Sequence, residues 1–309
     1  MPSRPVCGDP AAEVAPRTAF ISCNAACVRV EPRNVIAQQL QRRNVAGASL
    51  RWTDEIHDLA GHANLLFELV HRDLTIRYKR SVFGFLWTML HPLLLMVIFT
   101  IVFSHIFRRE TPHYETYFLS AYIAWNFFSQ TTTNAMASVA WNGPLMKRVR
   151  VPRSIFTLSA ILSGLVNLVL SLFALLIIML VMRAPLFPSL LFVPVSLLVV
   201  GIFTLGVSLA LTALSVFFAD VREMVQAGLP ALLYMTPTIY PVSIVPQRFR
   251  WIVERNPLTY LIEIVREPIY YGRLPATSTF AIALVLSLIS LLIGWMIFRR
   301  LAPSFEGRL

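Results

Sequence analysis

Two carboxylates near the end of the sequence have the spacing of an acid and base pair. Glu263 and Glu267 stand four residues apart, so a helix would present both on one face. Such a pair could act as general acid and base in a membrane glycosyltransferase. Because nothing else in the sequence supports that chemistry, we expect both carboxylates to pair with Arg266 or a neighbouring arginine instead.

The sequence contains no complete motif for a metal or a nucleotide. Cys23 with Cys27 lacks a further Cys or His pair at zinc-finger spacing, so we expect neither a metal site nor a disulfide. A nucleotide-binding P-loop has a lysine after its second glycine, whereas the pair Gly201 and Gly206 is followed by Val207. We therefore expect this chain to bind no cofactor. If the protein is an active transporter, a separate subunit must hydrolyse the ATP.

The charged residues of this 309-residue chain, 27 basic and 16 acidic, are distributed very unevenly. Six windows lack any charge: 81–107, 116–146, 154–182, 184–219, 224–247 and 274–298. Each exceeds the roughly 20 apolar residues with which a helix crosses a bilayer. This pattern, with a mean hydropathy of +0.65, excludes a soluble enzyme, a secreted disulfide scaffold and a disordered chain. It predicts an all-α polytopic membrane protein with six spans at approximately 83–107, 117–141, 155–182, 190–218, 224–241 and 277–298.

The net charge of +11 reflects membrane topology rather than nucleic-acid binding. Basic residues cluster where the predicted spans end, for example at Arg299 and Arg300 after the last window. By the positive-inside rule, we expect both termini and the loop after the second span to be cytoplasmic. The windows contain no Asp, Glu, Lys or Arg, so we expect no proton or sodium relay.

Before the first span, the sequence predicts a poorly ordered cytoplasmic extension at 1–58 and an amphipathic helix at 59–80. Apolar Phe67, Val70, Leu74 and Tyr78 recur on one face. We expect this helix to lie in the membrane interface, although an ordinary solvated helix packed on a soluble domain is the alternative. The residues assigned to it are Phe67, Val70, Arg72, Asp73, Leu74, Arg77 and Tyr78.

The second predicted span carries an unbroken polar run at 129–134, which would be costly facing lipid and must face protein or water. Aromatic residues around it would suit stacking on sugar rings. The alternative is an interfacial aromatic belt, which we favour for Tyr117 and Trp141 near the ends of the span. The candidates for a substrate pathway are Trp125, Tyr122, Phe128, Gln130, Thr132, Asn134, Trp87, Tyr234 and Tyr240.

Small polar residues recur every four positions in the next two predicted spans. Such stripes let helix backbones approach closely, so we expect them to pack helices rather than to bind substrate. The stripes are Ser159, Ser163, Asn167 and Ser171 in the third span and Thr204, Ser208 and Thr212 in the fourth.

Two loops have features of moving or docking elements. Asn256 followed by Pro257 predicts the start of a helix that runs to about Glu267, too short to span the membrane, and prolines precede it. The prolines offer a bend at which a gate within 242–273 could move, with Asn256, Pro257, Glu263 and Arg266 as candidate residues. The basic loop 143–153 either docks an ATPase or simply marks topology, and both interpretations can hold. Its candidate docking residues are Lys147, Arg148, Val149, Arg150, Pro152 and Arg153.

Four segments together resemble the membrane subunits of type-2 ABC exporters, most closely the branch that exports O-antigen, teichoic acid, capsule or galactan chains. They are 66–94, the loop 143–153, the string YMTPTIYP at 234–241 and NPLTYLIEIVR at 256–266. The resemblance covers 59–309. It implies an interface helix, six membrane helices, gate helices in the outer loop, and a homodimer in the bacterial inner membrane.

The resemblance also implies two ATPase subunits, which would carry the ATP and magnesium, and a lipid-linked glycan as substrate. The coupling contact with the ATPase would fall on the loop 147–153. The alternatives are a drug or lipid exporter of the same superfamily and, less favoured, the membrane glycosyltransferase.

Overall fold

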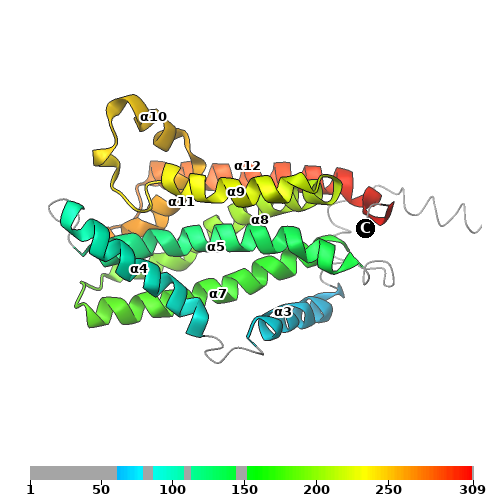
Figure 1. Ribbon diagram of the computed structural model, residues 1–309, viewed down its shortest axis with the longest axis horizontal. Coiled ribbons are helices and arrows are strands. Elements are labelled where there is room, and N and C mark those ends of the chain that lie inside the picture. Colours follow the sequence, from blue (N-terminus) through cyan, green and yellow to red (C-terminus); the bar gives the residue numbers. More distant parts are fainter. Residues whose placement is uncertain (1–60, 79–85, 108–112, 144–151, 308–309) are drawn as a thin grey trace, which may run out of the picture. The chain divides into compact units, whose positions relative to one another are not determined.

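The computed structural model of the chain describes residues 61–78, 86–107, 113–143 and 152–307, and these residues form helices and turns without a strand. The predicted extension 1–58 lies outside the described residues. The helices are α3 (Ala63–Tyr78), α4 (Leu86–Phe107), α5 (Tyr114–Trp141), α7 (Ser154–Val181), α8 (Val193–Phe217), α9 (Asp220–Met235), α10 (Gln247–Arg255), α11 (Pro257–Arg266) and α12 (Thr277–Leu301) (Figure 1). The short turns η1 (Pro188–Phe192), η2 (Val242–Ile244), η3 (Glu267–Tyr271) and η4 (Ala302–Gly307) lie between or after them.

Among the described residues, three helical segments are long and apolar enough to cross a membrane: Ser154–Val181, Pro188–Phe217 and Thr277–Phe305. They coincide with the third, fourth and sixth predicted spans. The other three predicted spans fall on α4, α5 and α9. Helix α4 is apolar over Leu90–Val102, the part whose side chains the structure describes. Polar side chains at 129–134 lower the hydropathy of α5, and the 16 residues of α9 reach only about 24 Å against a hydrocarbon core of about 30 Å.

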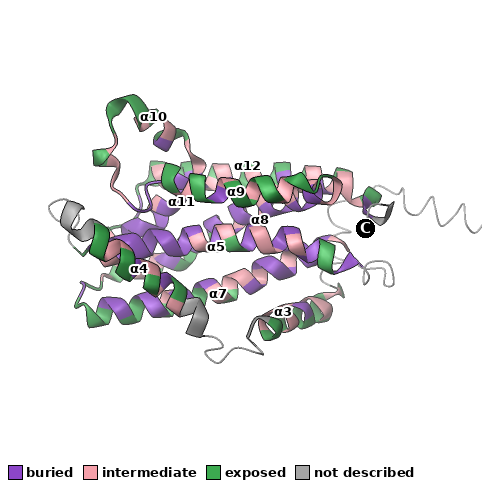
Figure 2. Ribbon diagram, in the orientation of Figure 1, coloured by how far each residue is buried: buried purple, intermediate pink, exposed green. Residues whose placement is uncertain are grey.

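Helix α5 is the central helix of the described bundle. It packs against α4, α7, α8, α9 and α11, and its residues are buried along most of its length (Figure 2). The other long helices instead turn large apolar side chains outward, such as Leu292 on α12 and Ile177 on α7. This distribution is typical of a membrane bundle, because the most polar of the long helices is shielded by helices whose outer faces suit lipid.

The small polar stripes pack helices, as their spacing predicts. Thr204, Ser208 and Thr212 on α8 are fully buried, and Ser159, Ser163 and Ser171 on α7 are buried as well. The helices α8 and α12 share the most extensive contact in the bundle. At their crossing the backbones of Gly206 and Gly294 touch, and Ser290 donates a hydrogen bond to the Phe203 carbonyl. Small residues at such crossings permit close approach of two helix backbones.

A second core cluster joins the end of the bundle where α5 finishes and α7 begins. It includes Leu69 from α3, Phe156 from α7, Phe298 from α12 and Phe305 from η4. Phe305 is fully buried and meets Phe298 edge-on, with ring centroids 5.7 Å apart. The C-terminal turn η4 is therefore part of the packed fold and not a free tail.

The fifth predicted span ends earlier than expected. Helix α9 stops at Met235, and Thr236 is extended because it precedes Pro237, which disfavours the helical region for the residue before it. Tyr240 consequently lies in a turn and not in a helix. The helix predicted from Asn256 and Pro257 is present as α11, with the Asn256 side chain accepting a hydrogen bond from the Leu258 amide at 3.0 Å.

Candidate functional site

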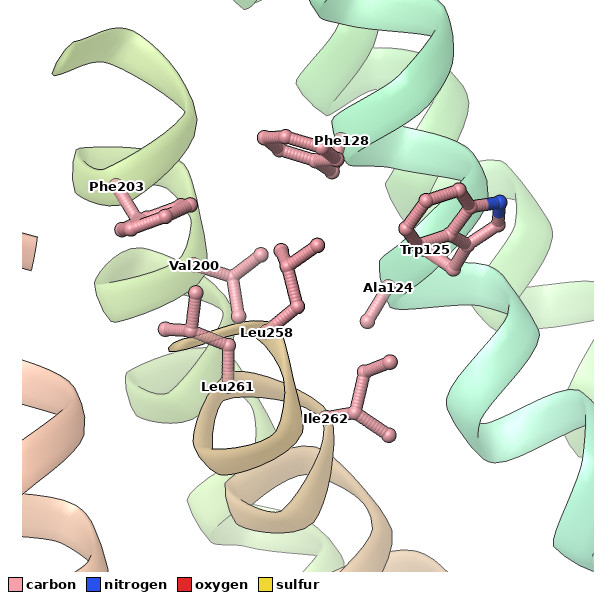
Figure 3. A pocket seen from close by; sticks show the side chains of 8 residues that line it. All are labelled: Ala124, Trp125, Phe128, Val200, Phe203, Leu258, Leu261 and Ile262. Atoms are coloured by element: carbon pink, nitrogen blue, oxygen red, sulfur yellow. The ribbon is translucent and has the colours of Figure 1, made fainter. Parts of the chain in front are cut away.

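The aromatic residues of α5 pack into the bundle. Trp125 and Phe128 are buried, and they line a small apolar cavity with Val200 and Phe203 of α8 and with the N-terminal half of α11 (Figure 3). Its volume is about 10 Å³, close to the lower limit for one water molecule. Tyr122 is also buried, and it stacks with Phe118. In this conformation these residues form core contacts and do not line an open channel.

The polar run of α5 divides between two environments. Thr131 and Thr132 are buried, and the Thr132 hydroxyl accepts a hydrogen bond from Ser208 of α8 at 3.4 Å. Asn134 is half-buried and Gln130 is exposed. The predicted pathway residues therefore do not gather around one surface, because the helical repeat turns Gln130 and Thr132 to different sides.

The remaining pathway candidates lie elsewhere. Tyr234 is exposed on the last turn of α9, and its carbonyl accepts a hydrogen bond from the Tyr240 hydroxyl at 2.8 Å. The side chain of Trp87 lies outside the described residues. Trp141 is 81% exposed at the end of α5, as expected for a belt residue. Tyr117, predicted to share that role, is buried, so the belt prediction is wrong for Tyr117.

Arg266 explains why Tyr117 is buried. This arginine, only 6% exposed, donates hydrogen bonds to the Tyr117 hydroxyl at 3.0 Å and to the carbonyls of Pro237 and Thr238 at 2.7 and 3.2 Å. Its guanidinium carbon also lies 3.9 Å from the centroid of the Tyr117 ring. A buried charge is costly unless it is hydrogen-bonded, and here a tyrosine and two carbonyls satisfy it.

The turn between α9 and α10 is held by further hydrogen bonds from α5 and α11. Tyr114 donates to the Ile239 carbonyl at 2.8 Å, and Tyr117 donates to the Tyr240 carbonyl at 3.2 Å. The Asn256 amide donates to the Thr236 hydroxyl at 3.0 Å. The segment after α9 is thus fixed mainly through its backbone carbonyls, so its position depends on the tyrosines and the arginine around it.

The carboxylate pair has separate partners. Glu267 is buried, and its two oxygens accept hydrogen bonds from Arg273 at 3.0 Å and from the Ala276 amide at 3.1 Å. Glu263 is half-buried, and its burial, with the nearby Glu267 carboxylate, raises its pKa above the usual range. The expected pairing with Arg266 or a neighbouring arginine is confirmed for Glu267, whose partner is Arg273, while Arg266 turns to α5. With both of its oxygens occupied, Glu267 is a poor candidate for acid and base catalysis.

The helix predicted at 59–80 is present as α3. Leu69 is buried where α3 packs on α7, whereas Phe67 on the predicted apolar face is 69% exposed, which is compatible with the predicted position in the membrane interface. Val70 and Leu74 are half-buried, and the side chains of Arg77 and Tyr78 lie outside the described residues.

Arg72 connects α3 to the end of α5. Its guanidinium pairs with Asp73 at 3.0 Å and donates to the Asn142 side chain at 3.0 Å. Asn142 is buried at the end of α5 and donates to the Ser138 carbonyl at 2.7 Å. This link fixes α3 beside the point where the chain leaves α5.

Only part of the predicted docking loop falls within the described residues. Lys147, Arg148, Val149 and Arg150 lie outside them, while Pro152 and Arg153 stand at the start of α7. Arg153 donates a hydrogen bond to the Ala302 carbonyl of η4. The beginning of α7 and the end of α12 are therefore at the same end of the bundle.

The contacts of Arg266 and Arg72 were not predicted from the sequence. A signal for the first exists, since Arg266 continues the buried stripe of Leu258 and Ile262 at a spacing of four and so shares their helix face. No comparable periodicity marks Arg72, whose partner Asn142 is far away in the sequence.

These features define a helical membrane protein with a polar, aromatic central helix and no sign of a built catalytic centre among the described residues. The family model for the ABC-2 type transporter matches residues 64–270, so the chain belongs to the ABC-2 type transporter family.

Curated relatives agree with this assignment. The chain is 30% identical over 247 residues to the O-antigen export system permease protein RfbA of Klebsiella pneumoniae, covering 78% of this chain and 93% of the relative. RfbA of Myxococcus xanthus is 28% identical over 243 residues, covering 78% and 92%. The polysialic acid transport protein KpsM of Escherichia coli is 22% identical over 235 residues, covering 74% and 90%.

Proposed function

We propose that this chain is the permease subunit of an ATP-driven exporter that moves a lipid-linked polysaccharide from the cytoplasmic to the outer side of a bacterial inner membrane. The observation that carries the proposal is the similarity to O-antigen and polysialic acid permeases, which extends over nine-tenths or more of those proteins. The aromatic and polar central helix α5 supports it, because sugar rings stack on aromatic faces and hydrogen-bond to hydroxyl and amide groups.

The functional unit in this proposal is a homodimer with two copies of a separate ATPase subunit, which binds ATP and magnesium. The cavity beside Trp125 has a volume of only about 10 Å³, so a sugar cannot pass beside Trp125 while the helices are packed in this way. A glycan path therefore requires either a second copy or separation of the packed helices. This chain itself acts as a transport subunit and catalyses no reaction.

The proposed topology has six spans, with α4, α5 and α9 completing the set and both termini in the cytoplasm. The hydrogen bond from Arg153 to Ala302 supports it, because the start of the third span and the end of the sixth must then lie on one side. Arg299 and Arg300 lie in the last turn of α12 at that same end, in agreement with the positive-inside rule.

Two elements take membrane-surface roles in this proposal. Helix α3 lies in the cytoplasmic interface with the exposed Phe67 toward lipid. Helices α10 and α11, of 9 and 10 residues, are too short to span and serve as gate helices on the outer side.

The docking of the ATPase is tested by charge reversal. Replacing Lys147, Arg148 and Arg150 with Glu should prevent the ATPase from co-purifying with the permease and should stop surface display of the glycan, while the protein still reaches the membrane. The matched control reverses the charge of the exposed Arg248 and Arg255 of α10, at the opposite end of the bundle. It should leave ATPase binding unchanged.

The function itself is tested in a strain that lacks the chromosomal copy. Lipid-linked glycan should accumulate inside the cell and return to the surface when the wild-type chain is supplied. If glycan display is normal without the chain while a drug or another lipid is retained, the polysaccharide assignment is wrong and the superfamily assignment stands.

A further inference from the structure

Arg266 connects three segments that are distant in sequence. From the last turn of α11, its guanidinium reaches the Tyr117 side chain of α5 and the carbonyls of Pro237 and Thr238 after α9. Tyr117 extends the connection by donating to the Tyr240 carbonyl. One cation therefore fixes the end of α11 and the α9–α10 connection to the central helix.

The same helix pair closes the cavity beside Trp125. Figure 3 shows that Ile262 of α11 lies toward Ala124 of α5, whereas Leu261 lies toward Val200 of α8, and all of them line the cavity. Ile262 is buried, and it lies one helical turn before Arg266. Any movement of α11 away from α5 that opens this cavity must also displace the Arg266 guanidinium from the Tyr117 side chain.

The partners of Arg266 suit a contact that can be broken. All three acceptors are neutral oxygens, and hydrogen bonds with only one charged partner are weaker than an ion pair with a desolvated carboxylate. The Nε atom of Arg266 is buried without a hydrogen-bond partner, so the closed arrangement does not satisfy every donor of the guanidinium. Arg273 provides a contrast, because it binds the buried Glu267 carboxylate from an exposed position.

We propose that Arg266 is a latch between α5 and α11. It is a positioning residue that holds the outer end of the helix bundle closed and releases Tyr117 when the transporter opens. This inference rests on the proposed function as an ATP-driven exporter. In the closed state the latch keeps Ile262 out of water. During turnover, α11 and the α9–α10 connection move away from α5 together, because the Arg266 guanidinium joins them through the Pro237 and Thr238 carbonyls, and the hydrogen bonds of Tyr114 and Tyr117 to that connection break as well.

The test measures the accessibility of a cysteine placed at position 262. The Ile262→Cys chain, with Cys7, Cys23 and Cys27 replaced by Ser, is reconstituted with its ATPase partner in lipid vesicles and treated with a small water-soluble thiol reagent. Labelling should be slow without ATP and about tenfold or more faster during ATP hydrolysis, as expected for exposure of a buried thiol.

The latch variants are Tyr117→Phe and Arg266→Lys, both conservative enough to keep the packing. Each should raise the labelling rate without ATP by about tenfold, which corresponds to the loss of one charge-assisted hydrogen bond, and should reduce the further rise with ATP. The matched controls are Tyr271→Phe and Arg248→Lys, which change an exposed tyrosine and an exposed arginine outside this contact. Both should label as slowly as the parent chain.

Two outcomes would overturn the latch. If the parent, Tyr117→Phe and Arg266→Lys proteins are all labelled equally slowly without ATP, Arg266 does not hold the cavity closed. If ATP hydrolysis leaves the labelling rate of the parent protein unchanged, the contact is a static brace. Neither result depends on the glycan, so a failure of the latch is distinguishable from a failure of the polysaccharide assignment.

Discussion

The crossing of α8 and α12 gives the sharpest prediction for stability. A Cβ atom added at Gly294 would lie 2.6 Å from the carbonyl carbon of Gly206 and even closer to its oxygen. Ordinary contacts between carbon atoms are about 3.5–4.0 Å, so α12 must retreat from α8 by roughly 1 Å. Because the obstacle is backbone, no side-chain rotation can relieve the clash.

The expected cost follows from the extent of this contact. Forcing extra volume into a well-packed interface costs about 1–3 kcal/mol, and α8 with α12 is the most extensive helix pair in the bundle. For a chain of this size, each kcal/mol lowers the melting temperature by about 2–4 °C. Gly294→Ala should therefore melt roughly 2–12 °C below the wild type.

The assay is thermal unfolding of the purified chain in detergent, followed by intrinsic fluorescence. Gly201→Ala on α8 is the matched control, because its added Cβ would meet only Leu165 Cδ2 at an ordinary 3.9 Å. Alanine also favours a helix over glycine, so the control should melt at or above the wild-type temperature. If Gly294→Ala and Gly201→Ala unfold alike, the close approach of the two backbones is not what stabilises this pair.

Three further predictions concern other parts of the chain. Glu263→Gln should raise the melting temperature at pH 8 and have little effect at pH 4. Because folding raises the pKa of Glu263, the protein loses stability as the pH rises from the pKa of the unfolded state through that of the folded state. An equal effect at both pH values would contradict this. Phe305→Ala should destabilise the protein by about 3–5 kcal/mol in a denaturant titration, whereas Phe249→Ala, exposed on α10, should be neutral. Replacing Arg72 with Met, which removes its hydrogen bond to Asn142, should lower glycan display more than it lowers the amount of protein in the membrane, and a proportional fall in both would indicate only a folding defect.

Much of the architecture follows from the sequence because lipid imposes simple rules. Charge-free stretches must be helical in a bilayer, and their positions agree with the long helices of the structure. The stripe of Thr204, Ser208 and Thr212 also follows directly, since a spacing of four places small residues on one helix face. Asn256 before Pro257 identified the start of α11 through local capping chemistry.

The candidate site was less predictable, because its residues depend on partners distant in the sequence. Trp125 and Gln130 share a helix and a polar, aromatic segment, yet one packs in the core and the other is exposed. On α3, the sequence singled out the face of Phe67, which is exposed, but not Leu69, the residue buried where α3 packs on α7. Periodicity identifies the faces of a helix, but it does not say which face finds a partner.

The sequence by itself determined that this chain is a helical membrane protein, and its motifs pointed to the ABC-2 type transporter family that the comparisons confirm. Those features are local, since hydropathy and helix caps are set by residues a few positions apart. Only the tertiary structure decided the partners of the buried polar groups. Arg266 bonds to Tyr117 rather than to either nearby carboxylate because the folding of α11 against α5 brings the tyrosine to the guanidinium, and no spacing along the chain encodes that approach.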